Sequence, residues 1–452
     1  MGPVTAAAAV PAIPAAVTRR VLLCCWLVVL ADGYDIGVFG AVVPGLLGYE
    51  PWGLSSVQVG GLAAWSLVGM LIGATVIGLL AERFGRKTML LVAIGLCALP
   101  QLAAALAPTP ELLGVARLIG GLGLGGVIPI AAAYTIEFSP PRRRSLNYGI
   151  MYSGYSLGIM LAALVAVAFL DRLGWRPVMG MGVVALLLIP FLAVALPQSI
   201  EQLTTAGRTD EAARVARSLG IEPEAAIAAA LPVDDEIRGM RWSDYLRTIF
   251  SSRYRLATAC FWVALFCGLL LVYGLNTWLP QIMRKAGYDL GSSLMFLLVF
   301  SIASAIGGVV IGRLADERGQ KPVLVTCYAL GALGILALMF RGPLLVNYIL
   351  VAIAGIGSIS TSLVLTGWVA HYYPARIRAA ATGMALSFAR IGAIVGPVIG
   401  GVIAGAGFGY QMNFVFFAVV GAVAAIAVAV LPVPTSAPSP EADPDELSTA
   451  GA

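Results

Sequence analysis

Two copies of one short stretch decide how this chain folds. The first is Gly78-Leu-Leu-Ala-Glu-Arg-Phe-Gly-Arg-Lys87, and the second is Gly312-Arg-Leu-Ala-Asp-Glu-Arg-Gly-Gln-Lys321. Glycine, an acid, glycine and lysine recur at the same spacing, and each copy follows a long apolar run. A pattern that recurs in corresponding places indicates duplication of one structural unit. The sequence therefore predicts two related halves.

The composition around these copies is typical of an integral membrane protein. Of the 452 residues, 60% are hydrophobic and 11% are charged, whereas soluble domains carry about 25% charged residues. This excludes a soluble enzyme, a disordered scaffold and a nucleic-acid binder, because each needs a polar or basic surface. The six cysteines lie in apolar runs and His371 is the only histidine. No metal, disulfide framework or cofactor is therefore expected.

The apolar runs predict an all-α membrane protein with twelve transmembrane helices, six in each half. A bilayer-crossing helix needs about 20 mostly apolar residues. The runs are 20–44, 55–81, 88–107, 110–136, 145–170, 176–196, 255–280, 291–316, 321–341, 343–371, 376–404 and 410–431.

The predicted domains follow from these runs. They are a disordered N-terminal tail (1–19), an N-terminal six-helix bundle (20–196), a central loop with short amphipathic helices (197–254), a C-terminal six-helix bundle (255–431) and a disordered C-terminal tail (432–452). Lysine and arginine concentrate in the loops on the side of the N-terminus, which predicts that both termini and the central loop are cytoplasmic. We expect a multi-pass protein of the cell (inner) membrane, in contact with lipid and monomeric.

The repeated loop has the chemistry of a latch between the halves. Its glycines allow close helix approach, its acid suits a helix N-terminus, and its basic side chains suit anionic headgroups or a helix C-terminus. We expect such contacts to hold the halves together on the cytoplasmic side. The residues predicted to take part in gating are Gly78, Glu82, Arg83, Gly85, Arg86, Glu137, Arg144, Asp316, Arg376 and Arg378.

These loops resemble the signature of the major facilitator superfamily, G-x-x-x-D-R-x-G-R-[KR]. The resemblance to this superfamily extends over nearly the whole chain. The chain departs from the signature with Glu82 in place of the aspartate and Glu317 where the second-half arginine would stand. The resemblance implies the superfamily fold of two six-helix halves related by a pseudo-two-fold axis. Drug/proton antiporters of the superfamily place G-P-x-x-G-G in the fifth span, whereas here Gly396-Pro-Val-Ile-Gly-Gly401 lies in the eleventh.

Within the superfamily, Asp32-Gly-Tyr-Asp35 is similar to the D-G-x-D of the aromatic acid:proton symporters. This family carries benzoate, hydroxybenzoates, protocatechuate, gentisate and related acids. Supporting stretches are 117–126, 140–145, 373–378 and 389–397. The resemblance implies proton-coupled import of an aromatic carboxylate by alternating access, with protons and the acid as the small-molecule partners.

Charged residues inside the spans are few, and a charge at bilayer depth costs about 2.5 to 3.5 kcal/mol on insertion scales. Asp32 and Asp35 are three residues apart, so they share one helix face. Burial and mutual repulsion favour the protonated form of one member. We therefore expect this pair to carry the proton. The alternative is that one aspartate is held in a permanent ion pair with Arg117 and never titrates.

Two arginines are candidate ligands for the substrate carboxylate. Arg390 lies near the middle of the eleventh span, in the second half, and its guanidinium grips a carboxylate with two parallel hydrogen bonds. The alternative role of Arg390 is to cap backbone carbonyls between packed helices. For Arg117, substrate contact and a static pair with Asp32 or Asp35 remain equally open.

Aromatic side chains would hold the ring of such a substrate by stacking and edge contacts. The candidates at mid-span are Trp65, Tyr152, Tyr155, Tyr273, Trp278, Trp368 and Phe388, with Asn276 as a donor to a ring hydroxyl. Each of them has packing, or the interfacial belt, as its alternative role.

Competing functions stay open at this point. A related carrier of another small organic acid, such as nicotinate, shikimate or a dicarboxylate, would share the same architecture. A receptor that senses aromatic acids usually adds an output domain, which the central loop does not resemble. An enzyme is not expected, because no nucleophile motif, metal cluster or phosphate loop is present.

Overall fold

The computed structural model describes residues 13–230 and 242–432, and helices are the only regular secondary structure in them. Twelve helical spans are long and apolar enough to cross a membrane, which confirms the predicted number. In the first half they are α1 (Ala15–Leu47), α2 (Ser56–Phe84), α3 (Arg86–Leu106), α4 (Pro110–Glu137), α5 (Arg144–Leu173) and the combined span of α6 (Trp175–Gly180), η2 (Met181–Leu187) and α7 (Leu188–Ala195).

In the second half the spans are α12 (Arg255–Lys285), α13 (Leu290–Arg318), α14 (Gln320–Ala337), the combined span of α15 (Leu344–Gly355), η4 (Ile356–Ser360) and α16 (Thr361–Tyr372), α17 (Ala375–Gly405) and α18 (Gln411–Val430). Five short helices complete the described residues: η1 (Pro141–Arg143), α8 (Ile200–Thr205), α9 (Thr209–Ser218), α10 (Pro223–Ala230) and α11 (Trp242–Ile249).

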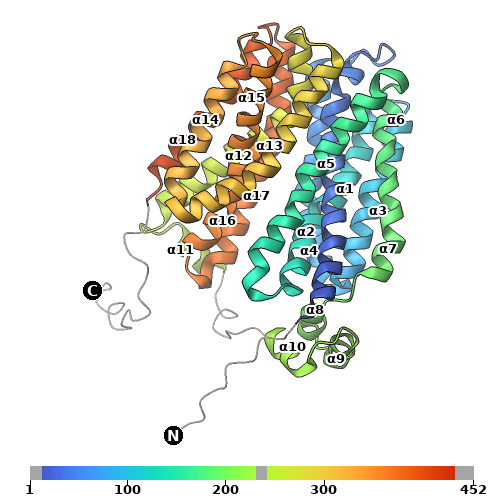
Figure 1. Ribbon diagram of the computed structural model, residues 1–452, viewed down its shortest axis with the longest axis vertical. Helices are drawn as coiled ribbons and strands as arrows, with labels where there is room; N and C mark the ends of the chain where they lie inside the picture. Colours follow the sequence, from blue (N-terminus) through green and yellow to red (C-terminus); the bar gives the residue numbers. More distant parts are fainter. Residues whose placement is uncertain (1–12, 231–241, 433–452) are drawn as a thin grey trace.

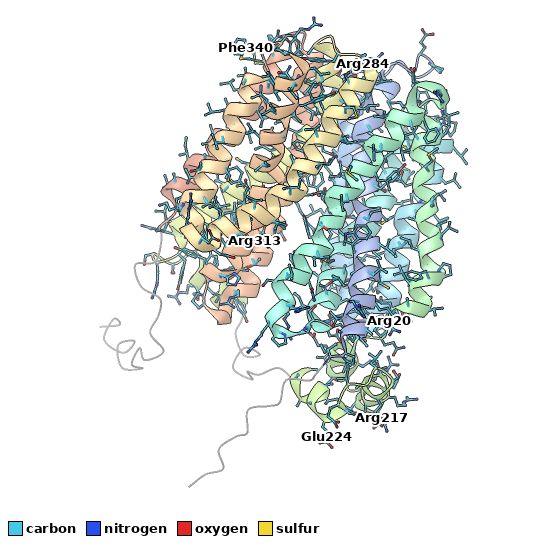
Figure 2. All side chains as sticks on the ribbon, in the orientation of Figure 1. Arg20, Arg217, Glu224, Arg284, Arg313 and Phe340 are labelled. Atoms are coloured by element: carbon cyan, nitrogen blue, oxygen red, sulfur yellow. The ribbon has the colours of Figure 1, made fainter. Side chains whose placement is uncertain are left out.

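The two sets of spans stand side by side, with α8, α9 and α10 beneath the first set (Figure 1). We call the end of the molecule that carries α8 to α10 the loop end, and the opposite end the far end. Figure 2 shows Arg20, Arg217 and Glu224 at the loop end, and Arg284 and Phe340 at the far end.

The repeated stretch makes the same corner in both halves. Gly85 follows α2 with φ +93° and ψ 139°, and Gly319 follows α13 with φ +91° and ψ 145°. Side chains strongly disfavour positive φ, so glycine is needed at both corners. This conformation turns the chain directly from one span into the next.

The hydrogen bonds between the two halves, among the described residues, all lie from mid-span toward the far end. The Asn276 amide donates to the Ile36 carbonyl at 3.1 Å, and Arg284 donates to the Pro44 carbonyl at 3.5 Å. Nearer the middle, Arg390 donates to the Met70 carbonyl at 3.1 Å. The halves are thus joined along α1, α2, α12 and α17 in this part of the molecule.

Candidate functional site

The two aspartates of α1 lie where that helix packs most closely against α5. Gly33, between them, sits against the Tyr155 carbonyl, and Gly158 sits against the Leu30 carbonyl, with no room for a Cβ at either position. Both aspartates are buried: Asp32 is 2% exposed and Asp35 is 4% exposed. Gly33 therefore allows α1 and α5 to approach closely beside the pair.

Asp35 is held in a buried ion pair. The Arg117 Nη1 lies 2.7 Å from the Asp35 Oδ1, and the guanidinium also lies over the Phe39 ring at 4.7 Å from its centroid. Hydrogen-bonded charge pairs of this kind compensate for the loss of water around each member. The structure thus pairs Arg117 with Asp35, and contact of Arg117 with substrate stays a prediction.

Asp32 has a different environment. Neither of its carboxylate oxygens has a hydrogen-bond partner among the described residues. The charged groups that act on it through space are Asp35 of the same helix and Arg390 of the second half. A buried, unpaired carboxylate is costly, and the cost disappears when it binds a proton. Asp32 is therefore suited to exchange a proton.

Arg390 brings a cation from α17 toward this carboxylate. Within the described part of the chain, its one hydrogen bond runs from Nη1 to the Met70 carbonyl of α2. Its other N–H groups make no hydrogen bond that the described residues show, while its charge acts on Asp32 and Tyr273. Arg390 therefore caps one backbone carbonyl and still has donors available.

Three tyrosines, Tyr152, Tyr155 and Tyr273, lie near these charges, and Tyr148 extends their row along α5. Along α5, the ring centroids of Tyr148 and Tyr152 are 6.2 Å apart, and those of Tyr152 and Tyr155 are 5.8 Å apart. The Tyr155 hydroxyl interacts with that of Tyr273 on α12, in the other half. Asp32, Arg390 and these rings form what we call the central cluster. It joins aromatic surface, a cation and an acid across the two halves.

The other predicted ligands lie outside the central cluster or are engaged in packing. Asn276 holds α1, as described above, and the buried Trp278 donates from its indole to the Pro397 carbonyl at 2.8 Å. Trp65 is 44% exposed beside Gly114 of α4. Trp368 packs edge-on against Phe261, and Phe388 stacks on Trp262 with centroids 4.9 Å apart.

The first predicted latch forms contacts within the first half and with α8. Arg86 lies 3.3 Å from Glu137, 3.2 Å from Glu201 and 3.9 Å from Glu82. Glu137 in turn accepts hydrogen bonds from the Ser199 hydroxyl and from the backbone N–H groups of Ile200 and Glu201. This network fastens α8 to the ends of α3 and α4, and a latch between the halves stays a prediction.

The remaining gating residues make local contacts. Arg83 lies over the Phe84 ring, Arg378 donates to the Tyr373 carbonyl, and Asp316 accepts from Gln320. Gly78 has open space around it, and Arg144 is exposed at the start of α5. The side chain of Arg376 lies outside the described residues.

The sequence analysis did not single out two polar residues that the structure places beside the predicted ones. Gln101 of α3 is 4% exposed and shares a small pocket with Asp35 and Arg117. A census of charged residues passes over an uncharged amide, although a lone glutamine within an apolar span is a usable signal. Glu201, the partner of Arg86, lies in the central loop, whose acids looked like those of a solvated surface.

Comparison with known proteins gives the family. The chain matches the family model described as Major Facilitator Superfamily over residues 25–363 and 293–450. It is 33% identical to a gallate transporter of Pseudomonas putida, over 90% of each chain. It is 32% identical to a gentisate transporter of Corynebacterium glutamicum, over 89% of this chain and 84% of that one.

A solved structure shows the same fold. The inward-open xylose transporter of E. coli superimposes with a TM-score of 0.73 at 18% identity, covering 90% of this chain and 95% of that one. The resemblance found in the sequence motifs is thus confirmed. The chain belongs to the major facilitator superfamily, and it is a membrane transporter, not an enzyme.

Proposed function

We propose that this protein imports an aromatic monocarboxylate together with protons across the cell membrane by alternating access. The observation that carries the proposal is the central cluster, in which the unpaired Asp32 faces Arg390 across the two halves. The names of the relatives, transporters of gallate and gentisate, support an aromatic acid as the cargo.

The chemistry of the cluster suits this cargo. The free N–H groups of Arg390 can grip a carboxylate, and the tyrosine rings offer faces and edges to an aromatic ring. We assign the proton to Asp32 and not to Asp35, because Arg117 already neutralises Asp35 at 2.7 Å. Asp35 and Arg117 then position α1 against α4.

Coupling follows from desolvation. An empty carrier with Asp32 charged would bury an unpaired carboxylate on closing, which opposes the change of state. Protonation of Asp32 removes this barrier, and substrate held by Arg390 supplies the charge balance in the cluster. The halves then rock about the cluster, which opens to the outside and to the cytoplasm in turn.

The test of this proposal is uptake into proteoliposomes. With an inward proton gradient, the wild-type protein should accumulate labelled benzoate, gentisate or gallate against its gradient. Asp32→Asn should lose accumulation but keep exchange of internal for external substrate, since the neutral amide imitates the protonated carboxyl group. Uphill uptake by Asp32→Asn at the wild-type level would remove the coupling role.

Arg390→Lys tests the carboxylate ligand. Lysine keeps the charge but loses the paired hydrogen bonds, so we expect a rise of about tenfold in the half-saturating substrate concentration, equivalent to about 1.4 kcal/mol. Concentration series of initial uptake rates measure it. Unchanged half-saturation with normal protein levels would assign the carboxylate to another group.

A carrier for another small organic acid is the alternative. A competition panel separates the two, because nicotinate, shikimate and aliphatic dicarboxylates should compete poorly if a benzene ring is required. Export is distinguished by reversing the imposed gradient.

A further inference from the structure

A cavity lies inside the first half and reaches Asp32. Its volume is about 390 Å³, and its walls come from α1, α3, α4, α5, η2 and α7. Most of the lining is aliphatic, for example Leu27, Ile94, Val165 and Leu188. Cavities of this size accommodate small organic ligands.

The polar side chains of this cavity include Asp32, Asp35 and Gln101. Gln101 is 4% exposed; its side chain donates to the Asp35 carboxylate, whereas its amide oxygen has no hydrogen-bond partner among the described residues. Gly182 of η2 packs directly on this side chain, because a Cβ there would lie 3.0 Å from it. A buried amide oxygen without a donor is an unfilled binding group.

The cavity reaches the side of the protein. Its lining includes Leu161, which is 39% exposed, and Val184, which is 60% exposed. Both lie well inside helices long and apolar enough to cross a membrane, so we expect these exposed side chains to face hydrocarbon. Figure 1 shows α6 and α7, which flank η2, along the outer edge of the first half. A ligand would therefore enter from the bilayer.

We propose that this side cavity binds an uncharged carboxylic acid with an apolar body, taken from the membrane and held by Gln101. The acid O–H donates to the amide oxygen of Gln101, which otherwise has no donor among the described residues. The aliphatic walls bury the apolar body. The ionised acid is excluded, because its charge would lie in an apolar pocket close to Asp32.

Occupancy of this site has a consequence for transport, if the proposed function is correct. An acid bound beside Asp32 would hinder proton exchange by that carboxylate. Binding of an acid to this cavity does not depend on which substrate the protein transports. It can therefore be measured without a transport assay.

The probes are 4-tert-butylcyclohexanecarboxylic acid, its primary amide and the corresponding sulfonate, tested on the full-length protein in lipid nanodiscs. For the acid, the apparent affinity should rise by about tenfold for each pH unit lowered, because the neutral fraction rises in that proportion above the acid's own pKa. The amide should bind equally at all pH values, and the sulfonate should not bind. At pH 8, where benzoic acid is almost wholly ionised, excess benzoate should not displace the amide.

Two variants locate the site. Gln101→Leu should weaken the acid and the amide at least tenfold, and Ala185→Phe, which fills the cavity, should abolish both. Ala168→Phe, on an exposed part of α5 outside the cavity, is the matched control and should bind as wild type. Unfolding temperature verifies that each variant is folded.

The opposite results would overturn the proposal. If binding of the acid is independent of pH and unaffected by Gln101→Leu, Gln101 does not hold an uncharged acid. The cavity would then be a place for lipid acyl chains. Displacement by benzoate, with no effect of Ala185→Phe, would move the probe to the central cluster. Failure of aromatic acid uptake alone would overturn the proposed function and leave this binding result standing.

Discussion

Asp35 and Arg117 are both buried, each with a side chain 6% exposed, and each neutralises the other. Removal of one member strands the second charge, which typically costs about 3 to 5 kcal/mol. Asp35→Asn should therefore lower the unfolding temperature in detergent, and the double variant Asp35→Asn with Arg117→Met should recover most of the loss. An unfolding temperature equal to wild type in the single variant would show that the pair is not stabilising.

At the scale of single residues, the sequence singles out the charged groups more clearly than the aromatic ones. Asp32, Asp35 and Arg390 stood out because a charge inside a span is costly, and the structure brings their interactions together around α1. Trp65 carried no such signal. Its helix is apolar on all sides, so the sequence did not distinguish an inward face from the exposed position that it occupies.

At the scale of elements, α2 packs against α4 through glycine. Gly73 lies against the Leu122 carbonyl, whereas Gly61 of the same helix has nothing within 4 Å of the position that a Cβ would occupy. Gly73→Ala should push the helices apart and destabilise the protein by about 1 to 3 kcal/mol. Gly61→Ala should stabilise by up to about 1 kcal/mol through helix propensity alone.

Chemical or thermal unfolding of both variants in one detergent measures this difference. Equal stability of the two would contradict the packing argument.

The spans themselves were predictable, because hydropathy reports directly on the length of chain that lies in hydrocarbon. The run 110–136 corresponds to α4 at Pro110–Glu137. The irregular stretches were not predictable. The π-helical η4 and the 3-10 stretch η2 differ from their flanking helices only in the register of the backbone hydrogen bonds. All of these segments are mostly apolar, so the pattern of apolar residues does not reveal the change of register.

At the scale of the whole molecule, α2 and α17 also come into close contact toward the far end. A Cβ on Gly60 would lie 2.6 Å from the Pro397 carbonyl oxygen, while Gly61 has open space. Gly60→Phe should therefore keep the halves apart at the far end and abolish uptake, with normal insertion into the membrane. Gly61→Phe should transport as wild type.

Labelling checks the cause of the loss. In the Gly60→Phe background, a cysteine at Met70 should react faster with a membrane-impermeant maleimide added from the far side. Native cysteines add little background, since all but Cys327 are buried. An unchanged labelling rate together with full uptake would contradict the role of this contact.

The repeated loop in the sequence indicated the division into two halves. The loop recurs because both corners need a glycine with positive φ, Gly85 in the first half and Gly319 in the second. How the central loop packs was not visible, because its contacts depend on Glu137 and Arg86 far away in sequence.

That attachment has a practical consequence. The Glu137 contacts with Ser199, together with the hydrogen bond from the Tyr134 hydroxyl to the Pro197 carbonyl at 3.1 Å, tie α8 to the first half, and α9 and α10 pack on α8. A fluorophore on the exposed Arg217 of α9 would thus move as a rigid pointer with that half. Paired with an acceptor dye at Asp316 of α13, it would follow each turnover of a single molecule by energy transfer.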